Sequence, residues 1–445
     1  MATTVRTLAA KQSFSSSLRA RLAEARIHTD SLFALVRPGA LTDRPIPERH
    51  RLIFYLGHLE AFDWNLLAIG AARLPSFHPE FDKLFAFGID PVGGGLPDDQ
   101  PSDWPSETQI RNYNLRVRGL TDRLIARPQG FPAIEPDGSP DTLLQVAIEH
   151  RLMHAETIAY LLHQLSLEKK ISWRGPTEIS AEVPRQESIE IPAGVATLGQ
   201  KRGVAFGWDN EFEQVSVQVE GFRAQKFPVT NAEFLEFVNA GGYQDRSLWS
   251  EADWQWIQSS STSHPLFWKR VGDAWLWKAM FAEIPLPLAW PVYVSHAEAS
   301  AFARWAGRKL PTEVQWHRIA YGSPDGSERQ YPWGASAPAR AYGNFDFDRW
   351  DPSPVNAHPA GDSVFGVSDL LGNGWEWTST QFEPLPGFRA FSFYPGYSAN
   401  FFDGSHFVMK GGSPRTAACM LRRTFRNWFQ PHYPYVYAKF RCIED

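Results

Sequence analysis

The pattern of hydrophobic and polar positions divides the chain into two parts of different character. In the first part, apolar residues recur at helical spacing over four segments, at about residues 12–37, 48–70, 106–127 and 141–167. Stretches rich in proline and glycine separate these segments. Amphipathic helices of this length bury their apolar stripes by packing together. The pattern therefore predicts a four-helix bundle.

Beyond about residue 170 the pattern becomes irregular. Short aromatic segments alternate with Gly, Pro, Asn and Asp, and most of the eighteen tryptophans lie in this part. Such a composition predicts a domain with much irregular backbone, whose loops are held by buried aromatic rings. We therefore expect an α+β protein with two domains, residues 1–175 and 186–445, joined by a linker within residues 168–188.

Three histidines lie on the predicted bundle helices in a pattern typical of a metal site. His150 and His154 are four residues apart and share one helix face, and His58 lies on the apolar stripe of an earlier helix. Three neutral imidazoles without a thiolate suit iron, zinc, copper or nickel, and they leave coordination positions open. A single histidine on an apolar face is more often a core residue. The prediction therefore depends on all three histidines meeting at one point.

Composition narrows the range of functions. The net charge of −5 gives no basic surface for nucleic acid or anionic lipid. The two cysteines, Cys419 and Cys442, are too few for a disulfide framework or a thiolate metal site. No segment is apolar for long enough to span a membrane, and the basic N-terminus lacks the apolar core of a signal peptide. These features predict a soluble cytoplasmic enzyme for small molecules, and they leave its oligomeric state open.

Five motifs follow one another in the second part of the chain: KFPVTNAEFLEFV, PVYVSHAEASAFARWAGRKLPTEVQWHRIAYG, YPWG, FGVSDLLGNGWEWT and KGGS. Their order resembles the C-type-lectin-like fold of formylglycine-generating enzymes, also called sulfatase-modifying factors. The preceding bundle, with His58 and an H-x-x-x-H-x-E signature that begins at His150, resembles a DinB-type helical domain. The combination is similar to the iron-dependent sulfoxide synthases of ergothioneine biosynthesis and their relatives, and most similar to selenoneine synthase.

The resemblance implies a metal cofactor and a set of substrates. Fe(II) would be held by His58, His150 and His154, with molecular oxygen as co-substrate. Hercynine, the trimethylated betaine of histidine, would accept a chalcogen atom at the carbon between its ring nitrogens. True formylglycine-generating enzymes instead bind copper through two cysteines after the GGS motif. Here that stretch reads GGSPRTAACMLRRTF, with Cys419 at neither expected position, so copper oxidase activity is not expected.

The resemblance also implies roles for residues of the second domain, which would form the substrate pocket. Tyr394 matches a catalytic tyrosine that delivers a proton or an electron. Tyr397, Asn427 and Trp428 match positions around hercynine. Because a trimethylammonium group has no N–H donor, its recognition relies on aromatic faces, which two of these residues provide.

Two positions differ from the branch of the family that takes γ-glutamylcysteine. An aspartate and an arginine hold the charged ends of that donor, whereas this chain has Phe429 and Tyr433. An arginine expected after the first-ligand helix is also absent from the loop LFAFGIDPVGGGLPDD. These changes remove the means of binding a zwitterionic peptide. Because aromatic rings stack on the apolar face of a sugar, the sequence favours a selenosugar donor and carbon–selenium bond formation, as in selenoneine biosynthesis.

Three alternatives remain open. An ergothioneine-type sulfoxide synthase would form a carbon–sulfur bond from cysteine or another thiol. Cysteine would need a charged partner, for which the candidates are Arg389, Arg415, Arg422 and Arg423. A metal-dependent thiol transferase would consume no oxygen, and a binding module would need no open metal site.

Overall fold

The computed structural model describes residues 2–87, 96–127, 131–172 and 182–444, and the chain divides into two compact units. The first unit comprises residues 1–173 together with Phe391–Pro395, and the second comprises the remainder of the chain. Helices and sheets are both present, which confirms the α+β class. The predicted division of the chain did not anticipate that residues 391–395 belong to the first unit. The predicted linker lies partly outside the described residues, at 173–181.

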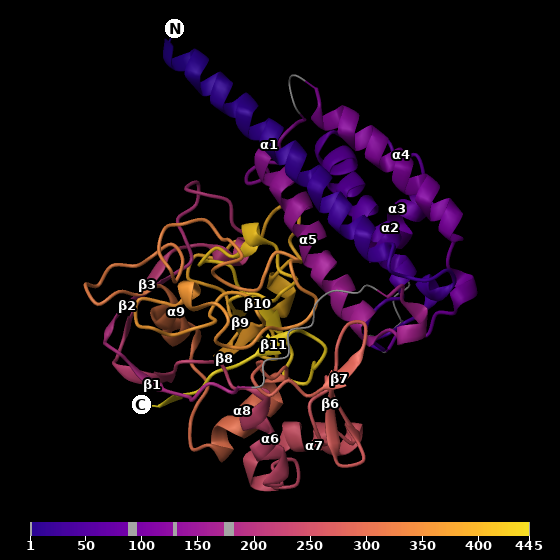
Figure 1. Ribbon diagram of the computed structural model, residues 1–445. Coiled ribbons are helices and arrows are strands. Elements are labelled where there is room, and N and C mark those ends of the chain that lie inside the picture. The colour runs from indigo at the N-terminus through magenta and orange to yellow at the C-terminus, as the bar shows by residue number, and fades with distance from the viewer. Residues whose placement is uncertain (1, 88–95, 128–130, 173–181, 445) are drawn as a thin grey trace. The chain divides into compact units, whose positions relative to one another are not determined.

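The first unit is helical (Figure 1). Its helices are α1 (Ala2–Phe33), α2 (Leu52–Asp63), α3 (Pro79–Phe87), α4 (Glu107–Ile125) and α5 (Pro140–Gln164), with short 3-10 turns η1 (Ala40–Thr42), η3 (Pro101–Asp103) and η4 (Leu167–Lys169). Helix α1 packs along α5, and α2 packs against α3, α4 and α5. Helix α2 is consequently buried on nearly all sides.

All four predicted helical segments are present, with corrected bounds. Helix α4 begins after Ser106, which forms a reciprocal capping box with Gln109. Helix α5 begins after Ser139, whose hydroxyl accepts a hydrogen bond from the backbone of Thr142. The segment predicted as one helix over 48–70 is α2 followed directly by the π-helix η2 (Trp64–Ala71). Helix α3 was not predicted, because it is short and adjoins a stretch rich in proline and glycine.

The described helices include none that is both long enough and apolar enough to cross a bilayer.

The second unit combines short strands, short helices and long irregular connections. Its strands are β1 (Ser188–Ile191), β2 (Gly194–Leu198), β3 (Val215–Val219), β4 (Phe222–Gln225), β5 (Trp268–Val271), β6 (Ala274–Lys278), β7 (Glu283–Pro285), β8 (Trp375–Gln381), β9 (Phe407–Lys410), β10 (Asn427–Phe429), β11 (Ala438–Lys439) and β12 (Ile443–Glu444). Its helices are α6 (Asn231–Asn239), α7 (Glu251–Ser260), α8 (His296–Trp305) and α9 (Glu313–Tyr321), with 3-10 turns η5 (Asp209–Glu211), η6 (Arg246–Leu248), η7 (Pro359–Gly361), η8 (Ala399–Phe401) and η9 (Ala418–Met420).

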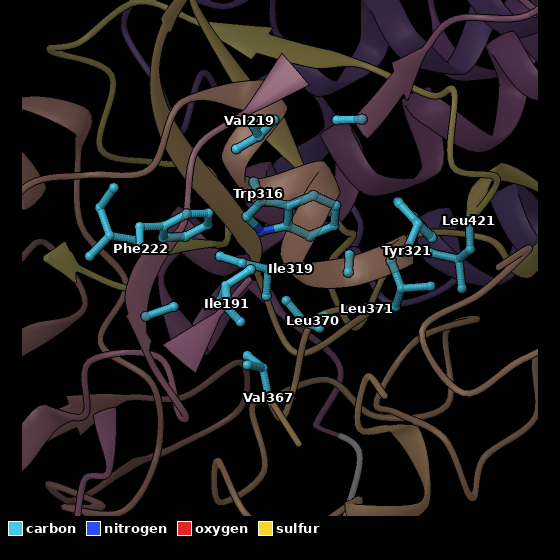
Figure 2. Packing of buried hydrophobic residues seen from close by; sticks show 14 of the residues in the cluster. Ile191, Val219, Phe222, Trp316, Ile319, Tyr321, Val367, Leu370, Leu371 and Leu421 are labelled. Atoms are coloured by element: carbon cyan, nitrogen blue, oxygen red, sulfur yellow. The ribbon is translucent and has the colours of Figure 1, made fainter. Parts of the chain in front are cut away.

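The strands form small sheets in the orders β1-β4-β12, β10-β9-β8-β11, β2-β3 and β5-β6-β7. Their pairing is antiparallel except between β11 and β8. A hydrophobic core surrounds helix α9, where Trp316 and Ile319 pack against Ile191 and Phe222 of the strands (Figure 2). These side chains are almost fully buried, and α9 itself packs mainly against β2, with further contacts to β3, β8 and β9.

A buried ion pair ties the C-terminal segment to this core. The Arg441 guanidinium donates to both carboxylate oxygens of Glu376, at 2.8 and 2.7 Å, and the remaining N–H groups reach backbone carbonyls. Glu376 also accepts a hydrogen bond from the Trp316 indole at 2.9 Å. Both charged side chains are fully buried, so each depends on the other and on these hydrogen bonds to compensate its charge.

We predict that Glu376→Gln destabilises the second unit strongly, because the charge of Arg441 would lose its counterion inside the core. The expected loss in the free energy of unfolding is about 3–5 kcal/mol. Urea unfolding followed by tryptophan fluorescence measures it, since most tryptophans belong to this unit. As a matched control, Glu283→Gln removes a partially exposed partner of Lys269 and should cost less than about 1 kcal/mol. Equal losses in the two variants would contradict the prediction.

Candidate metal centre and substrate residues

The three predicted histidines meet inside the first unit. His58 comes from α2, and His150 and His154 come from successive turns of α5. One ring nitrogen of each lies within 4.8 Å of the others, and the Nε2 atoms of His58 and His154 are 3.1 Å apart. Two ring nitrogens at this distance require a proton or a cation between them. A third imidazole beside them favours a cation.

The environment keeps the three imidazoles neutral. The Nδ1 atom of His58 lies 2.6 Å from the Phe85 carbonyl, which can only accept, so Nδ1 carries the proton and Nε2 presents a lone pair. Burial lowers the pKa of His58 to about 4. Burial and the neighbouring imidazoles also hold the pKa of His150 and of His154 well below the ordinary value. Neutral histidine is the form that binds a metal.

The case for a metal lies in the ring nitrogens that face one another. The Nε2 atoms of His58 and His154 do so, whereas the buried Nδ1 atoms of His150 and His154 have no hydrogen-bond partner among the described residues. The donor set of three imidazoles without a thiolate therefore fits a divalent transition metal.

A close helix contact positions His58. A Cβ atom on Gly57 would lie 2.5 Å from the Phe85 ring, so only glycine allows α3 to approach α2 this closely. This approach brings the Phe85 carbonyl to His58. Neither residue was predicted from the sequence. The available signal was a glycine next to a histidine inside a helix, where glycine costs about 1 kcal/mol relative to alanine.

A buried ion network joins the two helices that carry the ligands. Arg151, the neighbour of His150, donates to Glu60 at 3.0 Å and to Asp63 at 2.8 Å. All three side chains are buried, and Arg118 of α4 contacts Glu60 at 2.7 Å. Although burial alone would raise the pKa of Glu60, the charges of Arg151 and Arg118 hold it below the ordinary value. The network therefore keeps α2 and α5 in one register.

Tyr394 lies beside His150, and its segment, Phe391–Pro395, belongs to the first unit. The centroid of its ring is 6.4 Å from that of His150 and 5.4 Å from that of Phe62. Phe62 itself stacks on His150, with centroids 3.4 Å apart and ring planes 10° apart. The structure thus places the predicted catalytic tyrosine and a phenylalanine that was not predicted against one ligand.

Tyr397 and Trp428 belong to an aromatic cluster in the second unit. Their ring centroids are 5.5 Å apart in an edge-on arrangement. Trp428 also stacks on Phe382 at 4.1 Å, and Tyr397 stacks on Trp208 at 3.9 Å. Trp428 is only partly buried, so the cluster retains an accessible aromatic surface.

Phe429 and Tyr433 form a separate pair. Their rings are stacked, with centroids 5.2 Å apart and planes 12° apart. Along β10 successive side chains point to opposite faces, so Asn427 and Phe429 lie on one face and Trp428 on the other. The Asn427 side-chain oxygen accepts a hydrogen bond from the Trp428 backbone at 2.9 Å. The predicted substrate residues therefore form two groups with different surroundings.

The arginines considered as partners for an amino acid donor are mostly engaged. Arg422 is bound to both carboxylate oxygens of Glu211. Arg423 contacts Glu328 at 3.2 Å, and Arg415 lies over the Trp350 ring at 3.9 Å. Arg389 is exposed. Half of the stretch LFAFGIDPVGGGLPDD, in which an expected arginine is absent, lies outside the described residues, at 88–95.

Known proteins resemble the chain in both parts. Residues 176–445 match the family described as the sulfatase-modifying factor enzyme 1-like domain. Hercynine oxygenase from Mycolicibacterium smegmatis is 34% identical over 415 residues, covering 88% of this chain and 91% of that protein. Hercynine oxygenase from Mycobacterium tuberculosis is 40% identical over 240 residues, covering 53% and 56% respectively. Ergothioneine biosynthesis protein 1 from Neurospora crassa is 28% identical, covering 91% and 55%.

The fold and the matched region define a sulfatase-modifying factor enzyme 1-like domain that follows a helical unit with three converging histidines. The match to the M. smegmatis protein extends through both units. The chain belongs to the hercynine oxygenase family, although it spans little more than half the length of the relatives from M. tuberculosis and N. crassa.

We predict that Gly57→Ala weakens metal binding by about 10- to 100-fold, as expected when the partner of a ligand is displaced. The added Cβ would push the Phe85 ring away and separate its carbonyl from His58. Gly119→Ala is the matched control, because Gly119 also lies in a bundle helix but has only the Arg123 side chain near its Cβ position, at 3.6 Å. Competition titration of Fe(II) against a chelator measures both affinities. Equal affinity in the two variants would show that the Phe85 contact does not matter.

Proposed function

We propose that the protein is a non-heme iron enzyme that uses oxygen to attach sulfur to hercynine, as an ergothioneine-type sulfoxide synthase does. One observation carries the proposal: three neutral histidines, two of them buried and His154 half-buried, converge in a member of the hercynine oxygenase family, and Tyr394 lies beside one of them, His150. The names of the relatives support the sulfur reaction, which was the alternative at the level of sequence, rather than the preferred selenium reaction.

The proposed reaction balances with a thiol donor. Hercynine loses its ring C–H bond and the thiol loses its S–H bond, while a C–S bond and an S–O bond form. Dioxygen accepts four electrons, placing one oxygen atom in the sulfoxide and the other in water. Iron held by His58, His150 and His154 would supply the redox chemistry and leave coordination positions for the reactants.

The residues predicted to act in the reaction have distinct proposed roles. The Phe85 carbonyl orients His58 through its ring N–H. Tyr394 transfers a proton or an electron close to His150. Tyr397 and Trp428 offer aromatic faces to the trimethylammonium group of hercynine, and Asn427 offers a polar contact.

A selenosugar is the second candidate donor, and one observation favours it. The stacked rings of Phe429 and Tyr433 present apolar faces where the γ-glutamylcysteine-using branch has charges. A neutral ring can stack there, whereas the charged ends of a peptide would be desolvated without counterions. The same histidines would serve either donor.

We predict that His154→Ala loses bound iron and hercynine-dependent oxygen uptake together, because two imidazoles cannot hold the ion firmly. The fold should survive, as judged by circular dichroism. His28→Ala, a change on α1 outside the triad, is the control and should retain both properties. Elemental analysis and an oxygen electrode provide the measurements. Iron retained at one equivalent in His154→Ala would refute the ligand assignment, and wild-type product formation without oxygen consumption would indicate a thiol transferase.

We also predict that the wild-type protein uses γ-glutamylcysteine poorly. Each missing charged partner costs about 2–5 kcal/mol of binding. The double variant Phe429→Asp with Tyr433→Arg should therefore raise turnover of this peptide, on the order of 100-fold. Phe429→Leu with Tyr433→Leu is the control, since it removes the rings without adding charge, and it should gain no peptide activity.

Competition among the peptide, cysteine and a selenosugar, read by mass spectrometry of the hercynine product, identifies the donor. A selenium-containing product would establish the selenosugar, and a sulfur-containing product from cysteine would establish the thiol. Preferred use of γ-glutamylcysteine by the wild-type protein would contradict the role given to Phe429 and Tyr433.

A further inference from the structure

We propose that Asp137 and Ser392 form a clamp that positions Tyr394 for its part in the reaction. The inference rests on the proposed function, and it adds two positioning residues that do not touch the histidines. Asp137 precedes α5, and Ser392 lies 255 positions later in the chain, two residues before Tyr394.

The clamp uses both carboxylate oxygens of Asp137. The Ser392 backbone N–H donates to Oδ2 at 3.1 Å, and the Ser392 hydroxyl donates to Oδ1 at 2.8 Å. The same hydroxyl lies 3.3 Å from the Glu135 carbonyl. Because a backbone and a side-chain donor of one residue are held together, the direction of the main chain at Ser392 is restricted. A turn with a hydrogen bond from the Tyr394 N–H to the Phe391 carbonyl, at 3.1 Å, carries this restriction to the tyrosine.

A short hairpin around Asp137 lies directly against the segment that carries Tyr394. Ile134 and Gly138 exchange two backbone hydrogen bonds, at 2.8 and 2.7 Å, and so form a tight hairpin around Asp137. A Cβ atom on Gly138 would lie 3.0 Å from the Phe393 ring. The segment that carries Tyr394 therefore rests directly on this hairpin.

The hairpin leads without a break into the helix of the metal ligands. Ser139, the residue after Gly138, caps α5, and α5 carries His150 and His154. The clamp thus fixes Tyr394 relative to the same helix that fixes two of the ligands. Transfer between a side chain and reactants is sensitive to small displacements, and a shift of 1 Å can lower a rate by about 100-fold.

The clamp contributes little to overall stability. Ser392 is exposed and Asp137 is partly buried, and such hydrogen bonds contribute only modestly in net terms. Substitution at Ser392 should therefore leave the fold and the metal site intact while Tyr394 becomes less well placed. This separates a positioning role from a structural role.

The first test compares Ser392→Ala with Ser392→Thr in the full-length, iron-loaded protein. Removing the hydroxyl should lower kcat for hercynine-dependent oxygen uptake by about tenfold, because Tyr394 would be correctly placed only part of the time. The KM for hercynine, the iron content and the melting temperature should not change. Ser392→Thr retains the hydroxyl and should restore most of the rate.

The second test asks whether the effect acts through the tyrosine. In a Tyr394→Phe background, Ser392→Ala should cause no additional loss, because the group that the clamp positions is already absent. Ser247→Ala is the matched control: the Ser247 N–H and hydroxyl both donate to Asp245, at 2.9 and 2.6 Å, on an exposed turn of the second unit. This variant should retain the wild-type rate.

The outcomes separate the clamp from the proposed function. A wild-type protein without hercynine-dependent oxygen uptake would refute the proposed function itself. An active wild type with an unchanged kcat in Ser392→Ala would overturn the clamp. A decrease of the same size in the Tyr394→Phe background, or a loss of iron in Ser392→Ala, would also overturn it, because the serine would then act independently of the tyrosine.

Discussion

The arrangement of the three histidines depends on a buried arginine that lies outside the triad. Arg151 links α5 to α2 through Glu60 and Asp63, and these are the helices that carry the three histidines. Burying three charges is costly, and removing one would leave the others uncompensated, so the helices cannot slide past each other without a large loss. The network thus fixes the distance between His58 on α2 and the two histidines on α5. Burial and the neighbouring imidazoles are the main causes of the lowered pKa of His150, and the charge of Arg151 adds a smaller effect in the same direction.

The two units contribute different kinds of chemistry. The first unit supplies three neutral histidines, each held by its helix, and a tyrosine. The second unit supplies aromatic surfaces on a framework of short strands and buried tryptophans. In strand β10, successive side chains point to opposite faces. The adjacent residues Trp428 and Phe429 therefore contact different aromatic rings.

The parts of the site that depend on local spacing could be predicted from the sequence. His150 and His154 share a helix face because of their separation by four residues, and His58 was recognised by its place on an apolar stripe. The mixed fold class was likewise evident from the change in periodicity. The tyrosine was predicted from the family motifs. The hydrophobic pattern gives no sign that Tyr394 lies beside His150.

The remaining features arise from contacts between distant residues. The Phe85 carbonyl comes from a short helix that no strong pattern marked, and the approach of that helix depends on a single missing side chain at Gly57. The aspartate and serine beside Tyr394 are ordinary polar residues in turns, and only tertiary structure brings them together. The π-helix after α2 changes the helical register without a signal in the hydrophobic pattern.

The assignment of Phe391–Pro395 to the helical unit limits how far the protein can be treated as two interchangeable modules. A fragment that ends at residue 173 would contain the three histidines but not the tyrosine beside them. A fragment that begins after residue 173 would contain Tyr394 but not the hairpin against which the segment of Tyr394 packs. Recombination between relatives at the obvious boundary would therefore pair a metal site from one parent with a tyrosine segment from another. Such hybrids should retain activity only where the hairpin and that segment are inherited together.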